Sequence, residues 1–192
     1  FLNQNQKDLV NICLTGGMSF NKLQTTIVKK IFEDRKSNYY LTDERLDGSI
    51  KNFDLINSCF RDKRLDFKNI NPKYFHTKNR FIKYFNNNLP KNLNILFLSF
   101  GSRGHIASLF YNKDCLSNKR SIITKSYDLD ERISISYKYI LNSQVIYLFI
   151  LSKDKIIEFK SLYNNSKYSS FLRNIINRSK IYTFYSLKEY LQ

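Results

Sequence analysis

Glycine, proline and histidine are scarce in this sequence and tryptophan is absent: its 192 residues include five glycines, two prolines and two histidines. His76 and His105 lie far apart in the chain, without carboxylates at metal-ligand spacing, so we expect no metal site. The three cysteines form no CxxC pair, which argues against zinc and against a disulfide framework. Cys13, Cys59 and Cys115 are instead typical of buried thiols in a reducing cytoplasm.

Long apolar runs are missing as well. The longest, residues 145–151, is far short of the roughly 20 residues that a membrane-spanning helix needs. The first residues, "FLNQNQKDLV", lack the basic start and apolar centre of a signal peptide. With 192 residues, 42% of them hydrophobic, the chain is long enough for one domain, 1–192, with a full core. We therefore expect a single-domain cytoplasmic protein without a membrane partner.

Positive charge, by contrast, is abundant, with a formal net charge of +16 at pH 7. An excess of this kind predicts an anionic partner, such as nucleic acid, an anionic membrane or an acidic metabolite. The lysines and arginines are scattered, however, and no RNP-like or zinc-finger pattern accompanies them. Nucleic acid is therefore not the expected partner, and we expect a monomer that binds a small anionic molecule.

Strand and helix patterns alternate along the chain. Short apolar runs predict strands at 9–15, 38–44, 93–100, 132–136, 144–152 and 180–186. Apolar residues at helical spacing predict helices at 20–34, 50–60, 72–89, 153–163 and 169–179. The run 93–100, "LNILFLSF", shows little alternation, which is typical of an inner strand covered on both faces. Together the elements predict an α/β fold with a mostly parallel sheet and helices on both sides.

Glycines and polar residues follow several predicted strands, where the carboxyl ends of a parallel sheet bind ligands. "TGGMS" (15–19) would surround an anion with backbone N–H groups, or would be a glycine turn in which Ser19 caps the next helix. It matches neither the Walker A nor the GxGxxG pattern, so a nucleotide is not favoured. "TDER" (42–45), taken alone, is most often a solvated loop, although a carboxylate could orient an imidazole and Arg45 could bind an oxyanion.

The stretch "GSRGH" (101–105) is the strongest candidate for a site. Gly104 lets the backbone turn so that His105 can face a cleft, at a strand end and before the small-residue start of a helix. That placement favours a general base. His76, in a helix with mixed faces, is expected to be exposed or packed. Arg132 and Lys155 are either surface cations or, if they converge on the turn, the groups that neutralise a phosphate.

Five stretches in order, "LTGGMS", "TDER", "LFLSFGSRGHIASLF", "RISISYKYILNSQVIYLFI" and "LSKDK", resemble the 6-phosphogluconolactonases. Those enzymes belong to a larger sugar-phosphate group that also contains glucosamine-6-phosphate isomerase/deaminase. The corresponding family segments read GGS(T), DER, GxGxDGHTASLF, RxTLT and GxxK. The likeness spans roughly residues 9–162, and five weak pieces in the right order make it specific.

The resemblance implies a Rossmann-like three-layer α/β/α sandwich and hydrolysis of 6-phospho-D-glucono-1,5-lactone without a metal or an organic cofactor. By position, His105 would be the general base that activates water, and Asp43 and Arg45 would contact the substrate or the base. The groups that hold the substrate and its 6-phosphate would be Gly16, Gly17, Ser19, Arg103, Arg132 and Lys155.

Arg103 departs from the family pattern, which has Asp before the Gly-His pair. A cation there would lower the pKa of His105 by like-charge repulsion and keep the imidazole neutral. The isomerase/deaminase alternative is disfavoured, because that branch reads GHIAFNEP and DEY where this chain has "GHIASLFYN" and "DER". Arg103 and the charge of +16 leave open a further alternative, a non-catalytic sugar-phosphate or polyanion binder on the same fold.

Overall fold

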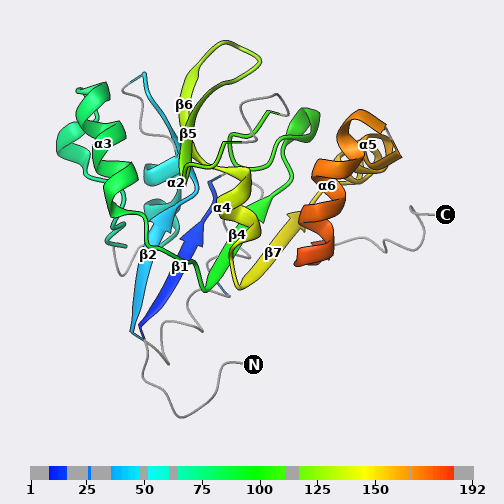
Figure 1. Cartoon of the computed structure of the whole chain (residues 1–192), viewed down its shortest axis with the longest axis horizontal. Helices are drawn as coiled ribbons and strands as arrows, with labels where there is room; N and C mark the ends of the chain where they lie inside the picture. The colour runs from blue at the N-terminus through cyan, green and yellow to red at the C-terminus, as the bar shows by residue number, and fades with distance from the viewer. Residues whose placement is uncertain are drawn as a thin grey trace.

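A five-stranded parallel sheet is the centre of the molecule (Figure 1). The structure is a computed structural model that describes residues 9–16, 26, 36–47, 52–60, 65–110, 117–164 and 166–183. The sheet has the order β2-β1-β4-β7-β8, and every neighbouring pair is parallel. Its strands are β1 (Val10–Leu14), β2 (Ser37–Leu41), β4 (Ile95–Ser99), β7 (Val145–Ile150) and β8 (Ser179–Thr183). The predicted α/β class with a mostly parallel sheet is confirmed, and the architecture is consistent with Rossmann-like layering.

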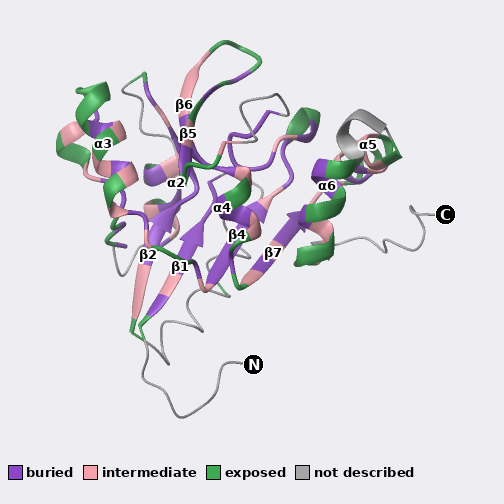
Figure 2. Ribbon diagram, in the orientation of Figure 1, coloured by how far each residue is buried: buried purple, intermediate pink, exposed green. Residues whose placement is uncertain are grey.

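The inner strands carry the core, as their apolar sequences require. Figure 2 shows the middle of the sheet coloured as buried, and the β4 residues Ile95 to Leu98 are all buried. The Phe97 ring stacks on Tyr147 and Phe149 of β7, with centroids 5.2 and 6.2 Å apart. Near-continuous burial is what a strand covered on both faces shows. The inner strand predicted at 93–100 is therefore confirmed.

A second, antiparallel sheet has the order β3-β6-β5 and consists of β3 (Asp43–Arg45), β6 (Glu131–Ile135) and β5 (Ser121–Lys125). The prediction of one strand over 38–44 is wrong, because Thr42 divides it between the two sheets. The Thr42 N–H donates to the Leu14 carbonyl of β1, whereas its own carbonyl accepts the N–H of Ile135. The strand predicted at 132–136 corresponds to β6 and belongs to this small sheet. The sequence patterns did not predict β5.

The described helices are α2 (Asn52–Cys59), α3 (Lys78–Asn88), α4 (Tyr137–Leu141), α5 (Lys153–Asn164) and α6 (Ser166–Arg178), with 3₁₀ turns η1 (Pro72–Tyr74) and η2 (Ser102–Gly104). The predicted helices 50–60, 153–163 and 169–179 correspond to α2, α5 and α6. The helix predicted at 20–34 lies, except for residue 26, outside the described residues. None of the described helices is long and apolar enough to cross a membrane.

The single helix predicted at 72–89 is wrong, because the chain leaves the helical conformation at Thr77, where φ is −127°. The break lets Phe75 and Phe81 pack edge to face with centroids 5.1 Å apart. Both are buried. Six residues of continuous helix would leave these side chains about 120° apart around the helix axis. His76 lies in the break and is exposed.

The carboxyl ends of β1 and β4 form the point where the strand order reverses. β1 lies between β2 and β4, so the chain leaves it toward one edge of the sheet and later returns to its other side. In doubly wound sheets the crevice at this point is the usual place for a ligand. Thr15 and Gly16 follow β1 there, and the 101–105 turn follows β4.

Candidate active site

The turn after β4 needs both of its glycines. The Gly101 N–H donates to the His105 carbonyl at 2.8 Å, which folds the segment tightly back on itself. A Cβ on Gly101 would lie 2.1 Å from Cε1 of His105, inside the imidazole ring's own space. Gly104 has φ +77°, and a Cβ there would lie 2.2 Å from Leu162 of α5. The glycines therefore allow the His105 ring and α5 to approach the backbone closely.

The helix expected to begin just after His105 does not form through Phe110. Ile106 instead bridges to Phe100 and to Leu109, and Ala107 has φ +52°. A turn in this conformation cannot continue as a right-handed helix. Its consequence is that Ser108 is buried with its hydroxyl facing β3.

The imidazole of His105 is fixed in one orientation. Its Nδ1 lies 2.7 Å from the Ser102 carbonyl oxygen, and its ring packs on Phe110 with centroids 4.9 Å apart. A carbonyl oxygen can only accept, so Nδ1 carries the proton and the neutral ring has its lone pair on Nε2. No described residue is hydrogen-bonded to Nε2. This is the arrangement of a general base that awaits a proton.

Burial is the main cause that favours the neutral form of His105. The pKa of His105 is lowered first by burial and then by the charges of Arg132 and Lys155, while the Ser102 carbonyl and the Asp43 charge raise it. The expected direction is therefore found, but its cause is not the expected repulsion by Arg103. The Arg103 side chain is exposed and its guanidinium lies 4.9 Å above the Tyr127 ring.

Asp43 is a buried carboxylate with three side-chain donors. It accepts hydrogen bonds from the hydroxyls of Thr42 and Ser108, each at 2.6 Å, and from the Asn52 amide at 3.1 Å. Within the described residues it makes no hydrogen bond to His105, and its effect on the imidazole is that of a nearby charge. Asp43 thus lies beside the base without orienting it directly.

Gly16 connects the end of β1 to the same network. It is buried, and a Cβ at this position would lie 2.0 Å from the side-chain oxygen of Asn52. Only glycine therefore leaves room for the amide that binds Asp43. The other two residues predicted for the phosphate loop, Gly17 and Ser19, lie outside the described residues.

Glu44, the middle residue of "DER", caps helix α2. Its carboxylate accepts the backbone N–H groups of Asn52, Phe53 and Arg45 at 3.3, 2.8 and 2.9 Å. Only 1% of Glu44 is exposed, and burial raises its pKa to about 7 against the opposing effect of these donors. Sequence reasoning missed this role, because Glu44 lies eight residues before Asn52 and not at the N-cap position to which capping signals apply.

Arg45 and Arg132 are directly opposite each other in the β3–β6 pair. Asp130 separates their charges, with its Oδ2 at 3.2 Å from Nη1 of Arg45 and 4.0 Å from Nη2 of Arg132. The buried Nε of Arg132 has no hydrogen-bond partner in the described part of the chain. Arg132 therefore retains donor capacity for an anion, whereas Arg45 is held by acidic neighbours.

Lys155 reaches the site from the first turn of α5. Its backbone N–H bonds to the Ser152 hydroxyl at 3.3 Å, which fixes the helix start. Burial lowers the pKa of its half-buried ammonium, and the charge of Glu158 partly offsets this effect. Among the described residues Lys155 makes no ion pair of its own. The structure thus brings two of the predicted cations, Arg132 and Lys155, within electrostatic reach of His105.

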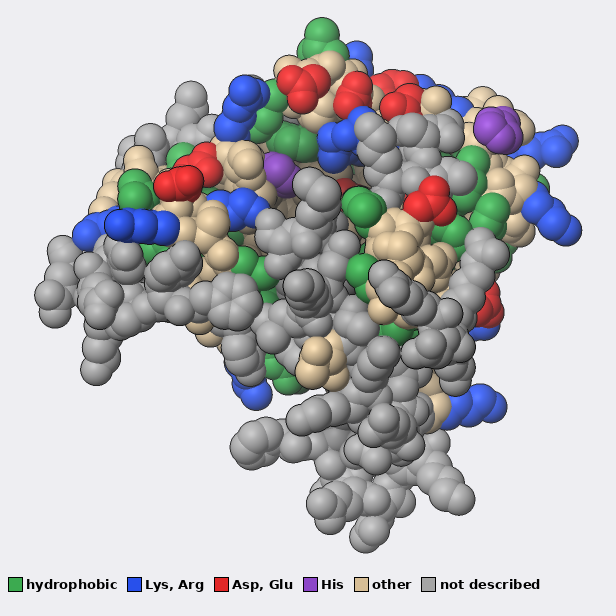
Figure 3. Space-filling model, turned by 180° about the vertical axis from the view of Figure 1, so that it is seen from behind, with side chains coloured by type: hydrophobic (Ala, Val, Ile, Leu, Met, Phe, Trp, Pro, Cys, Tyr) green, Lys and Arg blue, Asp and Glu red, His purple; other side chains and the backbone are tan. Residues whose placement is uncertain are grey.

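A cleft of about 260 Å³ is lined by His105 and Arg132, whereas Lys155 is not among its lining residues. In Figure 3 a histidine is visible in a hollow of the surface, with Lys or Arg side chains beside it. Three residues predicted for the site line the cleft: His105, Arg132 and the exposed Arg103. The remaining lining residues are Ser102, Phe110, Ser126, Tyr127 and Asp128. The cleft is a little smaller than the roughly 300–1,000 Å³ of a typical small-molecule site, and it combines aromatic rings with charged groups.

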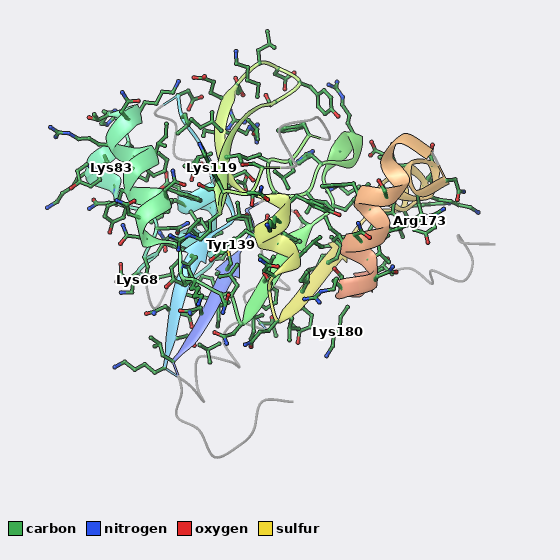
Figure 4. The ribbon with its side chains drawn as sticks, viewed as in Figure 1. Lys68, Lys83, Lys119, Tyr139, Arg173 and Lys180 are labelled. Atoms are coloured by element: carbon green, nitrogen blue, oxygen red, sulfur yellow. The ribbon has the colours of Figure 1, made fainter. Side chains whose placement is uncertain are left out.

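None of the cations labelled in Figure 4 is among the residues that line the cleft. Figure 4 shows cationic side chains pointing outward from separate parts of the molecule. They belong to α3, α6, β8 and two loops, and those labelled are Lys68, Lys83, Lys119, Arg173 and Lys180. These five described cations do not by themselves form the continuous basic face that a polyanion binder needs.

Comparison with known proteins identifies relatives along most of the chain. The family model described as glucosamine-6-phosphate isomerases/6-phosphogluconolactonase matches residues 2–170. A 6-phosphogluconolactonase of Borreliella burgdorferi is 27% identical over 171 residues, which cover 80% of this chain and 73% of that protein.

Solved structures share the fold at lower identity. The 6-phosphogluconolactonase from Trypanosoma cruzi superposes with a TM-score of 0.73 at 16% identity, covering 95% of this chain and 85% of that one. The enzyme from Thermotoga maritima gives a TM-score of 0.69 at 17% identity, covering 93% and 86%. Because the family model spans far more than half of the sequence, the chain belongs to the family of glucosamine-6-phosphate isomerases and 6-phosphogluconolactonases.

Proposed function

We propose that the protein hydrolyses 6-phospho-D-glucono-1,5-lactone to 6-phosphogluconate, with His105 as the general base and without a metal or an organic cofactor. Family membership and the 6-phosphogluconolactonase among its relatives support this substrate. The observation that carries the proposal is the orientation of His105. Its Nδ1 faces the Ser102 carbonyl at 2.7 Å, so the neutral imidazole has its lone pair on Nε2.

The proposed reaction starts when Nε2 of His105 takes a proton from water. The water oxygen bonds to the lactone carbonyl carbon, and the carbonyl oxygen becomes an oxyanion that nearby cations stabilise. Collapse of this intermediate breaks the bond between the carbonyl carbon and the ring oxygen. The imidazolium then returns its proton to that oxygen, which leaves a hydroxy acid and the free base.

The cations of the site have separate roles in this proposal. Arg132, with a buried Nε that lacks a partner among the described residues, and Lys155, with a desolvated ammonium, would hold the 6-phosphate. Gly16, Gly17 and Ser19 would add backbone and hydroxyl donors. Binding of a remote phosphate positions the lactone ring against His105 and so contributes to the rate.

Asp43 and Arg45 have indirect roles beside the base. The Asp43 charge raises the pKa of His105 and so opposes the cations that surround the ring. Arg45 holds Asp130, which lies between it and Arg132 at the edge of the cleft. We propose that both residues set the electrostatics of the site and that Arg45 also contacts the substrate.

The isomerase/deaminase chemistry of the same family is the second candidate, and the chain lacks the acid that it needs. The residues after His105 and Ile106 are Ala107, Ser108, Leu109 and Phe110, all of them buried. None can shuttle a proton in place of the glutamate of that branch. We therefore place the protein with the lactonases, and further propose that it acts as a one-domain monomer in the cytoplasm, where Cys13 and Cys59 stay reduced.

The experiment is hydrolysis of freshly prepared 6-phosphogluconolactone, followed by acid release against the spontaneous rate in the same buffer. Turnover above the blank that depends on enzyme concentration supports the proposal. A rate equal to the blank, combined with tight binding of 6-phosphogluconate, would instead establish a sugar-phosphate binder. Production of ammonia from glucosamine 6-phosphate would establish the deaminase.

A further inference from the structure

Arg103 and Tyr127 contact each other in two ways across the mouth of the cleft. The Arg103 guanidinium lies 4.9 Å from the centroid of the Tyr127 ring, which is a cation–π geometry. The Tyr127 hydroxyl donates to the backbone carbonyl of Arg103 at 3.3 Å. The two residues lie 24 positions apart, one in the turn after β4 and the other at the tip of the β5–β6 hairpin.

The backbone of Arg103 needs such support. Its φ of +59° and ψ of 24° are in the left-handed region, which disfavours side chains other than glycine. Such a conformation persists only where the surrounding structure holds it, and it is concentrated at functional sites. Here it directs the Ser102 carbonyl toward Nδ1 of His105. The orientation of the base therefore depends on a turn that its own sequence does not favour.

The tip of the hairpin provides a firm anchor for Tyr127. The Ser126 N–H bonds to the Asp130 carbonyl at 2.9 Å, and the Leu129 N–H bonds to the Ser126 carbonyl at 3.0 Å. The Ser126 hydroxyl also accepts the Asp130 N–H at 3.1 Å. Because this loop is closed by its own hydrogen bonds, Tyr127 is held in a fixed position relative to the 101–105 turn.

A chain of rings leads from this pair to the base. Tyr127 packs edge to face on Phe110 with centroids 5.2 Å apart, and Phe110 packs on His105 at 4.9 Å. Arg132 approaches the same Phe110 ring at 5.8 Å. All of these side chains line the same cleft. Tyr127 and Phe110 thus form the wall that separates His105 from solvent on this side.

We propose that Arg103 and Tyr127 form a clasp, which holds the tip of the β5–β6 hairpin against the turn after β4. The clasp fixes the position of the His105 imidazole and shields it from water. Both are positioning residues and neither takes part in proton transfer. The cation before the Gly-His pair is thus held by a tyrosine of the chain's own hairpin.

The first test measures His105 directly and does not depend on any activity. The chain has only two histidines, so the imidazole signals of His76 and His105 can be followed separately by NMR during a pH titration. The groups that act on His105 are Asp43, Arg132 and Lys155, and Arg103 and Asp128 share the cleft. Tyr127→Ala changes none of these charges. We expect it to raise the pKa of His105 toward the ordinary value of 6.5, because water reaches the ring.

Controls distinguish the clasp from a general effect on the hairpin. Leu129→Ala removes an exposed side chain of the same loop, outside the cleft, and should leave the His105 titration unchanged. Tyr127→Phe keeps the ring under the guanidinium but removes the hydroxyl bond to the Arg103 carbonyl, so its effect should be smaller than that of Tyr127→Ala. The clasp is refuted if Tyr127→Ala leaves the pKa of His105 where it is.

The second test is kinetic and rests on the proposed lactonase function. Tyr127→Ala should lower kcat about tenfold with little change in KM, because it removes the cation–π contact and the ring contact that orient the base. Arg103→Gly relieves the backbone strain and should lower kcat only about two- to fivefold.

In the double variant the second change should cause no further loss of kcat, since the partners act as one unit. Multiplicative losses, or a rise in KM alone for Arg103→Gly, would overturn the clasp. Absence of wild-type turnover would overturn only the proposed function, because the NMR titration remains decisive for the clasp.

Discussion

The hydroxyl of Ser108 donates a 2.6 Å hydrogen bond to Oδ2 of Asp43, although the two residues are 65 positions apart. Both are buried. This bond joins the segment after His105 to the strand β3 and places a negative charge beside the imidazole.

Replacing Ser108 by alanine should therefore destabilise the fold. Asp43 would keep only its bonds to Thr42 and Asn52, and part of a buried charge would lose its donor. We expect the free energy of unfolding to fall by about 1–3 kcal/mol in urea denaturation. Ser58→Ala, at an exposed position of α2, is the control and should stay within about 0.5 kcal/mol of the wild type. Equal effects for the two variants would contradict the account of this bond.

Glu44 should make the free energy of unfolding fall as the pH rises, which is opposite to the usual effect of a carboxyl group. Burial raises its pKa in the folded state to about 7, above the ordinary value of 4.5, so the folded protein holds the proton more tightly. This contribution to stability is complete below about pH 4.5 and is lost as the pH rises through 7.

The comparison that isolates this effect is the wild type against Glu44→Gln, which cannot ionise. Relative to that variant, the free energy of unfolding of the wild type should fall by about 3 kcal/mol between pH 4.5 and 7. Urea denaturation at several pH values measures this difference. If the difference rises with pH, the three N–H donors outweigh burial and the carboxylate is the favoured form.

Lys155→Ala should affect substrate binding more than chemistry. A phosphate that stays bound from ground state to transition state contributes equally to both, so its loss raises KM with little change in kcat. Lys153→Ala, an exposed lysine in the same turn of α5, should leave both constants unchanged. If kcat falls and KM does not, Lys155 stabilises the oxyanion instead of the phosphate.

Arg103→Asp, which restores the residue of the family pattern, should reduce activity in this chain. An acid cannot form the cation–π contact with Tyr127, and it raises the pKa of His105. Because the base must be neutral to act, the acid limb of the pH–rate profile should move to higher pH. A higher rate at the optimum would show that the substituted arginine weakens the enzyme and that the clasp has no benefit.

The sequence was sufficient to predict the strands of the parallel sheet, because an apolar run such as 93–100 has one plausible environment. It was also sufficient to single out the 101–105 turn, since glycines are rare in this chain. The change of sheet at Thr42 was not predictable, because it depends on hydrogen bonds to Leu14 and Ile135 from distant segments.

The parts of the site that sequence reasoning missed are likewise contacts between distant segments. Ser108 and Asn52 bind Asp43 across 65 and 9 positions. No local pattern identifies a serine or an asparagine that will face a carboxylate. The cause of the lowered His105 pKa was assigned to its neighbour in sequence, Arg103, whereas burial dominates and the effective cations come from β6 and α5. Charge effects follow distance in space, which sequence adjacency represents poorly.

The most direct test of the account compares lactone hydrolysis by the wild type, His105→Ala and His76→Ala. We predict turnover of fresh 6-phosphogluconolactone above the spontaneous rate for the wild type. His105→Ala should lose about 10²–10⁴-fold of it, the usual contribution of a positioned general base. The exposed His76 can be replaced without effect. Folding should survive in both variants, as thermal unfolding will report. If His105→Ala retains full turnover while correctly folded, His105 is not the base and the proposed mechanism is wrong.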